Sequence, residues 1–290
     1  MKHIIENDRL KIEISDTGAE LSSIYDKKND REVLWQADPA YWKRHAPILF
    51  PNVGKTWQNR YLYNGSTYPT KQHGFARDMT FECICSDNFS ITHRLCSDTS
   101  TLNVYPFPFI LEITQTLSKN HIQIQWRVTN TGTETMYYTI GAHPAFNVPA
   151  EEGTEQKDYQ LLFHTDNPAY ILLDPQHGTA CPDTSYILET KDGRLSIGES
   201  RFAKDALIFD HQITWAGIAF PDGTPYVSVT CGDFPYFGIW SAKNAPFVCL
   251  EPWDGRCDNC GFDGDISTKP GIISLDPGCT YNKSYTITIH

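Results

Sequence analysis

Two ionisable residues end apolar segments of this sequence, and each is followed directly by a proline. Glu251 comes after the apolar segment 247–250, and His143 comes after the strand-like segment 137–142. An ionisable group at the end of a strand, with its backbone restrained by proline, can be held rigidly at the mouth of a sheet. Partial burial there would raise the pKa of a carboxyl group toward neutrality and keep a histidine near its own titration range. Both effects suit general acid–base catalysis, although a single histidine is more often a surface or hydrogen-bonded core residue.

Two further segments place histidine and arginine among apolar residues, glycine and proline. Residues 44–51 read Arg-His-Ala-Pro-Ile-Leu-Phe-Pro, and residues 72–77 read Gln-His-Gly-Phe-Ala-Arg. Together with residues 141–146 and 249–254, they are the four short segments in which ionisable groups stand inside otherwise apolar sequence. These four segments are therefore the candidates for carrying chemistry.

The elements that would position these segments are β-strands, because alternation of apolar and polar residues dominates the chain. It is clear at residues 10–14, 122–129 and 285–289, and it indicates antiparallel sheets with one face in a core. Residues 226–230 and 247–250 are β-branched or apolar without alternation, which predicts strands buried on both faces. Helical periodicity is scarce. The best candidate is a short turn that opens at Asp38, where the acid could cap it and Pro39 would take the first helical position.

Many strands separated by Gly and Pro turns predict an all-β sandwich or barrel. No repeat of 20–50 residues is found, which argues against a propeller. All-β sandwiches often reach 290 residues as one unit, and no linker interrupts the chain, so residues 1–290 are expected to form a single domain.

The net charge of −11 excludes some classes of partner. It would repel nucleic acid phosphates and anionic lipid headgroups, so neither a nucleic acid nor a membrane is expected as a partner. No apolar segment is long enough for a signal sequence or a membrane span, which favours the cytoplasm. The odd number of cysteines, nine, fits reduced thiols better than a disulfide framework. Buried thiols are expected at the strand-like positions Cys83, Cys85, Cys96, Cys231 and Cys249.

No metal is expected from the sequence patterns. Cys257 and Cys260 form a lone CxxC motif without the second pair or the histidines of a zinc site. The acidic residues of segment 254–265 do not have the spacing of an EF-hand, so they are expected to form a solvated loop.

Three motifs carry a resemblance to a known family. HGFAR at residues 73–77, GAHPAF at 141–146 and LEPW at 250–253 occur in an order that resembles the aldose 1-epimerase (galactose mutarotase-like) family. More narrowly, the chain resembles the LacX-like and hexose-phosphate-epimerase-like branches of that family, over essentially its whole length. The resemblance implies a large antiparallel β-sandwich, of the galactose mutarotase-like supersandwich type with few short helices, whose concave face binds a pyranose.

The resemblance also implies roles for individual residues. Glu251 corresponds to the carboxylate base of the family and His143 to its general-acid histidine. The residues expected to bind the sugar are His73, Arg44, Arg77 and Asp210, with Asp205 lying close to the last in sequence. One or two aromatic side chains could stack on the sugar ring, while most belong to the core. The aromatic candidates are Trp57, Trp240, Trp253, Tyr236 and Phe237.

The implied activity is that of an isomerase, an aldose 1-epimerase (mutarotase) that interconverts sugar anomers by acid–base ring opening without a cofactor. A hexose-6-phosphate 1-epimerase remains an alternative, although residues 44–47 read Arg-His-Ala-Pro rather than the Arg-Gly-Gly-Ile-Pro of hexose-phosphate epimerases. Two further alternatives are a carbohydrate-binding protein without catalysis and, less favoured, a glycosidase that uses Asp210 and Glu251. The chain is expected to act as a monomer or a homodimer.

Overall fold

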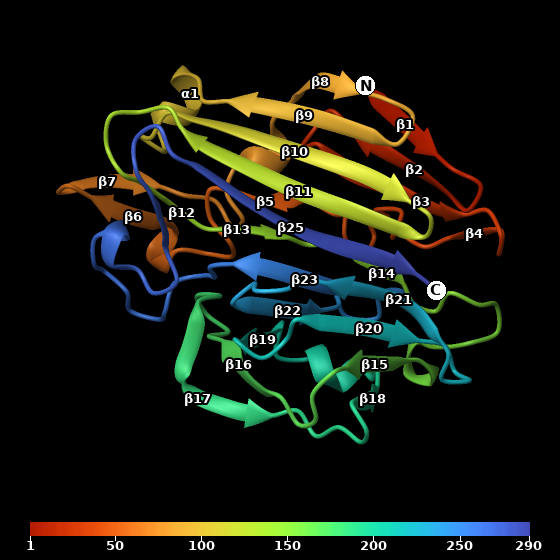
Figure 1. Cartoon of the computed structure of the whole chain (residues 1–290). Coiled ribbons are helices and arrows are strands. Elements are labelled where there is room, and N and C mark those ends of the chain that lie inside the picture. Colours follow the sequence, from red (N-terminus) through yellow and green to blue (C-terminus); the bar gives the residue numbers. More distant parts are fainter.

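Alternating apolar residues build the larger of two antiparallel sheets in the computed structural model, which describes the backbone of residues 1–290 and every side chain except those of Glu199 and Ser200. Its strands β9, β10, β11 and β25 run across the front of Figure 1. The nine strands of this sheet, in spatial order, are β18 (Arg194–Ser196), β15 (Gln160–Phe163), β20 (Trp215–Ala219), β21 (Pro225–Thr230), β25 (Thr280–Ile289), β11 (His121–Asn130), β10 (Phe109–Ser118), β9 (Ser90–Cys96) and β8 (Glu82–Ser86).

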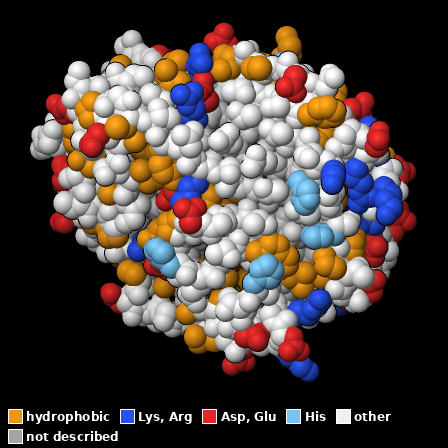
Figure 2. Space-filling model, viewed as in Figure 1, with side chains coloured by type: hydrophobic (Ala, Val, Ile, Leu, Met, Phe, Trp, Pro, Cys, Tyr) orange, Lys and Arg blue, Asp and Glu red, His pale blue; other side chains and the backbone are white. Residues whose placement is uncertain are grey.

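Strand β11 shows why this sheet has one buried face and one solvent-exposed face. Ile122, Ile124 and Trp126 are buried, whereas Gln123 and Gln125 between them are exposed. Successive side chains of a strand point to opposite faces, so one face enters the core and the other meets solvent. Figure 2 shows this solvent side, where uncharged side chains and backbone cover much of the centre and acidic and basic side chains intermingle toward the rim. The strands predicted at 10–14, 122–129 and 285–289 are confirmed.

The second large sheet packs against the first and carries the candidate site. Its strand β23 is buried along its whole length, as the apolar segment 247–250 predicts. The strands of this sheet, in spatial order, are β17 (Ala180–Ile187), β16 (Ala169–Leu173), β19 (Leu207–Asp210), β22 (Tyr236–Trp240), β23 (Phe247–Asp254), β13 (Ile140–Ala142) and β5 (Ile48–Leu49), and β14 (Ala145–Asn147) also pairs with β23.

The main core lies between the two large sheets. Val248 and Leu250 of β23 join one hydrophobic cluster with Leu111 and Val128 of the larger sheet. The other face of β23, carrying Cys249 and Trp253, packs into smaller clusters away from this core. The face of β23 that carries Cys249 and Trp253 therefore lies outside the main core and can line a cavity. The sequence expectation of an antiparallel β-sandwich with few short helices is confirmed.

Three small sheets flank the sandwich. A four-stranded sheet holds the amino terminus beside β8 (Figure 1), and two two-stranded sheets complete the strands. The four strands are β1 (Lys2–Glu6), β2 (Leu10–Ser15), β3 (Glu20–Asp26) and β4 (Arg31–Glu32), and the two pairs are β6 (Arg60–Tyr63) with β7 (Ser66–Pro69) and β12 (Met136–Tyr138) with β24 (Ile273–Leu275).

Helices are few and short. At Asp38 the chain forms a hydrogen-bonded turn whose Asp38 carboxylate accepts from the backbone of Ala40, without continuing into a helix. The α-helix, α1 (Thr99–Leu102), begins at Asp98, which caps it together with Thr101 and was not expected. No helix among the described residues is long and apolar enough to cross a membrane. The short 3-10 helices are η1 (Trp57–Asn59), η2 (Ala76–Asp78), η3 (Gln156–Asp158), η4 (Glu199–Phe202) and η5 (Ile266–Thr268).

All nine cysteines carry free thiols, as expected. The prediction that the strand cysteines are buried holds for Cys231 and Cys249 but is wrong for Cys85 and Cys96, which are exposed, while Cys83 is half-buried. Cys85 lies near the end of β8, the edge strand of the larger sheet, and Cys96 ends β9 beyond the residues that pair with β8.

Candidate active site

The cavity is centred on His143 and Glu251, which face each other across two paired strands. Gly141 of β13 pairs with Trp253 of β23, and Ala145 of β14 pairs with Cys249 in the same register. The chain leaves the ladder at His143-Pro144 and rejoins it without a shift, so His143 stands opposite Glu251. His143 Nε2 lies 3.3 Å from Glu251 Oε2.

Both members of the pair are buried and short of polar partners. Glu251 is 1% exposed and His143 is 6% exposed. Both carboxylate oxygens of Glu251 and Nδ1 of His143 lack a hydrogen-bond partner. Burial, reinforced by the negative charge of Asp205, raises the pKa of Glu251 well above its ordinary range. Burial, with the nearby Arg77 guanidinium, lowers the pKa of His143 to about 3.

A cavity of about 410 Å³ opens in front of this pair. The Trp42 ring lies 4.7 Å from the His143 ring between centroids, and the Trp240 ring lies 5.6 Å from it, nearly perpendicular. A six-carbon sugar has apolar ring faces that pack on such aromatic walls. The polar and charged residues that line the cavity are Lys43, Arg44, Gln72, His73, Arg77, His143, Asp205 and Glu251.

His73 enters the cavity with a defined protonation state. Its Nδ1 accepts a hydrogen bond of 3.1 Å from the backbone N–H of Gly54, so the ring proton resides on Nε2. The side-chain amide of Gln72 lies 3.3 Å from Nε2 and can accept this proton when its oxygen faces the ring. Burial, with His143 and the arginines nearby, keeps the pKa of His73 well below its ordinary value. His73 therefore presents a neutral N–H donor.

Two arginines give the cavity its positive charge. Arg44 pairs with Asp78 and donates a hydrogen bond of 3.3 Å to the backbone oxygen of Arg77. Arg77 donates one of 2.7 Å to the backbone oxygen of Gln72, and its buried Nε has no partner. Burial and the neighbouring Arg44 lower the pKa of Arg77. The Nε–H of Arg77 is thus left without a partner among the described side chains.

The structure does not bring Asp210 into this cavity. Asp210 ends β19 with a half-exposed carboxylate that bonds to His211. Asp205 lines the cavity instead, from the turn before β19, with its backbone at φ +75° and its carboxylate accepting a hydrogen bond of 2.8 Å from the Ala206 N–H. Of the residues expected from the resemblance, Glu251, His143, His73, Arg44 and Arg77 share the cavity.

Two glycines make room for the cavity wall at Trp253. A Cβ at Gly141 would lie 2.6 Å from the Trp253 ring, and one at Gly238 would lie 2.5 Å from it. Both positions lie in strands that pair with β23, so the indole is held flat between its neighbours. Of the aromatic residues proposed from the sequence to stack on the sugar, Trp240 and Trp253 line the cavity, whereas Trp57, Tyr236 and Phe237 do not. Trp42 also lines the cavity and was not among the residues proposed from the sequence.

The sequence pattern of the aldose 1-epimerase family matches residues 1–288. The chain belongs to the aldose 1-epimerase family. It is 34% identical to the chromosomal protein LacX of Lactococcus lactis subsp. lactis, over 98% of each chain. Its fold matches a galactose mutarotase related enzyme from Lactobacillus acidophilus with a TM-score of 0.95, at 34% identity over 100% of this chain and 97% of that one. A galactose mutarotase-like protein from Lactobacillus casei gives 0.91 at 31% identity, with both chains covered fully.

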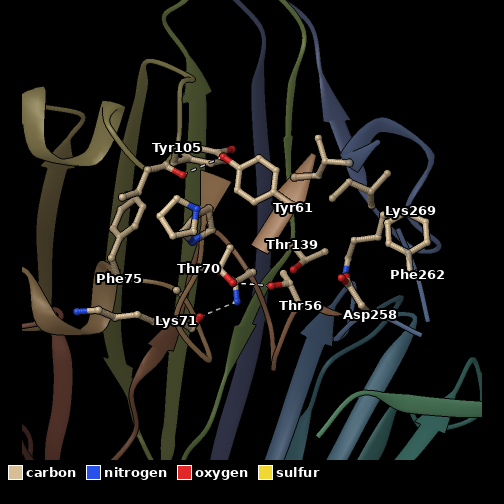
Figure 3. Close-up of a pocket in the computed structure, with 17 residues that line it drawn as sticks. Thr56, Tyr61, Thr70, Lys71, Phe75, Tyr105, Thr139, Asp258, Phe262 and Lys269 are labelled. Atoms are coloured by element: carbon tan, nitrogen blue, oxygen red, sulfur yellow. Dashed lines mark hydrogen bonds and ion pairs between the residues drawn. The ribbon is translucent and has the colours of Figure 1, made fainter. Parts of the chain in front are cut away.

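This member of the aldose 1-epimerase family has a second cavity, of about 350 Å³, behind the loop that carries His73. Figure 3 shows the rings of Tyr61 and Tyr105 on one side and Asp258 beside Lys269 on the other. Asp258 is buried and forms an ion pair of 2.7 Å with Lys269, so the expectation of a solvated acidic loop is wrong at this residue. The pair satisfies both charges, which leaves the cavity wall largely apolar.

Asn52 links the second cavity to the candidate active site. Its side-chain amide donates hydrogen bonds to the backbone oxygens of Gly54 and Lys71, at 2.9 and 3.0 Å. These two backbone segments flank His73, and Gly54 is the residue whose N–H holds the His73 ring. Asn52 therefore fixes the loop geometry on which the orientation of His73 depends.

Proposed function

We propose that this chain is a cofactor-independent aldose 1-epimerase that interconverts the α and β anomers of a hexose. The observation that carries the proposal is the buried pair His143 and Glu251, opposed at 3.3 Å on the floor of a cavity large enough for one pyranose. Membership of an isomerase family supports the same class of reaction.

The reaction needs one proton removed and one supplied. A base takes the proton from the C1 hydroxyl while an acid delivers a proton to the ring oxygen, so that the C1–O5 bond breaks and an open aldehyde forms. Rotation about C1–C2 followed by closure gives the other anomer. Each proton transfer of this kind is worth roughly 10²–10⁴-fold in rate.

The opposite pKa shifts of the pair suit this exchange. Glu251, whose pKa is raised, is a strong base once ionised, and His143, whose pKa is lowered, is a strong acid once protonated. In the empty site burial favours the neutral form of both, with the exchangeable proton on Glu251. When a bound sugar supplies hydroxyl groups to both residues, we assign transfer of this proton from Glu251 to His143 Nε2 across 3.3 Å, which leaves Glu251 as the base and His143 as the acid. Ring closure reverses the roles.

The remaining polar groups would orient the sugar. We assign hydroxyl contacts to the His73 N–H, the Arg77 guanidinium and the Asp205 carboxylate, with Arg44 held nearby by Asp78. Donors aimed at the ring and anomeric oxygens stabilise the negative charge that develops there. Trp42 and Trp240 would pack on the ring and limit its position.

A phosphorylated hexose is the second candidate substrate, and one observation favours it. Lys43, Arg44 and Arg77 all line the cavity, and among the described side chains only Arg44 of the three has a carboxylate partner. Arginine and lysine together are the usual partners of a phosphate. Against this, Asp205 brings a negative charge to the same cavity.

Anomer exchange measured by NMR with freshly dissolved glucose, galactose and glucose 6-phosphate tests the proposal. We expect the protein to accelerate exchange of a free hexose, and Glu251→Gln to abolish the acceleration. Glu82→Gln, an exposed glutamate on β8, is the matched control and should keep full activity. An exchange rate far higher with glucose 6-phosphate than with glucose and galactose would show that the substrate is the phosphosugar and not the free sugar. Sugar binding with no acceleration, unchanged in Glu251→Gln, would show a binding protein instead.

A further inference from the structure

Four potential metal ligands from four separate segments meet at the edge of the molecule where β1 lies beside β8 (Figure 1). His3 lies on β1, Asp16 follows β2, Cys83 lies on β8 and His93 lies on β9. Cys83 and His93 are direct partners in the β8–β9 register, so their side chains share one face of the sheet. None of the four lines the cavity of the candidate active site.

The four side chains converge on a small volume. The Cys83 sulfur and one ring nitrogen each of His3 and His93 lie within 4.8 Å of one another. Asp16 Oδ1 lies 2.6 Å from His3 Nε2 and 3.3 Å from His93 Nε2. The two imidazole rings are 5.2 Å apart between centroids and meet edge to face. One sulfur and two nitrogens therefore lie close together, and the Asp16 carboxylate contacts both histidine rings beside them.

Part of this cluster lacks the partners that a buried polar group needs. The His93 side chain is fully buried, and its Nδ1 has no hydrogen-bond partner. Buried polar atoms in folded proteins are nearly always satisfied, so Nδ1, unpaired among the described side chains, calls for an additional group. The remaining Asp16 oxygen is held by the amino terminus at 2.7 Å, which orients the carboxylate toward the histidines.

We propose that His3, Asp16, Cys83 and His93 form a zinc site that joins the amino-terminal sheet to the β8–β9 edge. Thiolate, imidazole and carboxylate are the ligands that Zn²⁺ takes, and four of them complete a closed tetrahedral site of the structural kind. Zinc–ligand bonds of about 2.0–2.3 Å place ligand atoms roughly 3.3–3.8 Å apart. The ligand atoms of His3, Cys83 and His93 lie within 4.8 Å of one another, and Asp16 contacts both rings, so side-chain rotations would bring the four ligands to these separations.

Zinc at this position would stabilise the folded chain and would not change the cavity of the candidate active site. It would hold β1 and the end of β2 against β8 and β9, segments that meet elsewhere through an isolated bridge between Thr17 and Thr80. A metal that binds the folded chain more tightly than the unfolded chain raises the melting temperature in proportion to the logarithm of its concentration. Binding and stability, rather than epimerase activity, are therefore the properties to measure.

Co²⁺ titration of the full-length protein, prepared without a histidine tag and with reduced thiols, tests the site. We expect one equivalent of Co²⁺ to give the near-ultraviolet charge-transfer band of a thiolate ligand and the intense visible bands of tetrahedral cobalt, both lost when one equivalent of Zn²⁺ is added. Cys83→Ser should lose the charge-transfer band, and His93→Gln should weaken Zn²⁺ binding at least about tenfold. Cys85→Ser, an exposed thiol on the same strand, is the matched control and should keep both signals.

The other outcomes overturn the proposal. No thiolate band in the wild-type protein, or a band that persists in Cys83→Ser, would show that the four residues form only a hydrogen-bonded cluster. A band lost in Cys249→Ser or Glu251→Gln, but kept in Cys83→Ser, would place the metal among the buried His143, Cys249 and Glu251 instead. A melting temperature that Zn²⁺ raises equally in the wild type and in His93→Gln would contradict the site independently of the spectra.

Discussion

His143 and Glu251 are opposed in one unbroken register, because β13 and β14 pair with the same strand β23 on either side of His143. Side chains directly opposite in an antiparallel pair lie on the same face, about 4.5–5.5 Å apart at Cβ. The ladder thus sets the separation of the two groups, and Pro144, although it has no N–H, accepts a hydrogen bond of 3.2 Å from the Leu250 N–H, so the register does not shift. A proton-transfer pair built in this way needs no loop to close before it is aligned.

Removing either member of the pair should therefore be equally damaging. We expect Glu251→Gln and His143→Asn each to lower kcat for anomer exchange by about 10²–10⁴-fold, because each removes one of two coupled proton transfers. The double variant should lose little more than either single variant, since residues that act as one unit are not additive. Exchange rates by NMR, with folding checked by circular dichroism, measure the effect. Retention of most of the rate by either variant would refute the assigned roles.

The burial of Glu251 predicts how stability depends on pH. The raised pKa of Glu251 means that the unfolded chain gives up this proton at a lower pH than the folded chain, so wild-type stability falls as the pH rises above about 4.5. Glu251→Gln removes this loss and should melt higher than the wild type at pH 8, with the difference vanishing near pH 4. Melting temperatures between pH 4 and pH 8 check this. A variant that melts lower than the wild type at pH 8 would contradict the raised pKa.

The lowered pKa of His143 predicts the pH profile of the reaction. Because this pKa is about 3 instead of 6.5, kcat/KM should show no inflection that belongs to His143 between pH 5 and pH 8. The exposed His121 gives a control, since His121→Asn should leave the profile unchanged. An acidic limb centred near 6.5 in the wild type and absent in His143→Asn would show that the histidine titrates normally in the free protein.

The strands and the two candidate residues for acid–base chemistry were accessible from the sequence for a physical reason. Alternation reveals which face of a strand is buried, and an ionisable residue that ends an apolar run, as Glu251 does, stands out against it. The opposition of Glu251 and His143 was not accessible, because it depends on pairing between segments about one hundred residues apart. Trp42 was missed for the same reason: it reaches the His143 ring from an irregular segment without periodicity.

The proposed metal ligands show the same limit more sharply. The sequence led to the expectation of no metal, because zinc motifs were sought at short, regular spacings. His3, Asp16, Cys83 and His93 lie on four segments that only the tertiary fold brings together. The two cysteines of the short-range CxxC motif lie in different environments, because the Cys257 thiol is buried and the Cys260 thiol is exposed.

The choice between Asp205 and Asp210 is decided by local backbone geometry that no motif displays. Asp205 reaches the cavity from a left-handed turn, whereas Asp210 bonds to the exposed His211. We expect Asp205→Asn to raise KM for the sugar and to lower the pKa of Glu251, because the negative charge of Asp205 contributes to raising it. Asp210→Asn should change KM less than about twofold. Steady-state kinetics on both variants decide the matter, and the reverse ranking would restore Asp210 as the hydroxyl ligand.

The link between Gly54 and His73 predicts an effect on the rate from a residue that contributes no side chain. Gly54 has φ +66°, and a Cβ there would lie 2.6 Å from the Cys257 Cβ, so Gly54→Ala must displace the backbone whose N–H holds His73 Nδ1. Gly65→Ala is the matched control, because Gly65 has φ +75° with no atom within 4 Å of the added Cβ. Both variants carry a left-handed alanine, at a cost of about 1–2 kcal/mol in the free energy of unfolding.

The two alanine variants should therefore differ in catalysis more than their shared backbone strain explains. With His73 displaced, Gly54→Ala should lower kcat/KM about tenfold or more, while Gly65→Ala keeps the wild-type value. Kinetics below the melting transition, together with denaturant unfolding of both variants, separate lost positioning from lost stability. Equal kcat/KM in the two variants would mean that the Gly54 hydrogen bond to His73 does not position the histidine for the reaction.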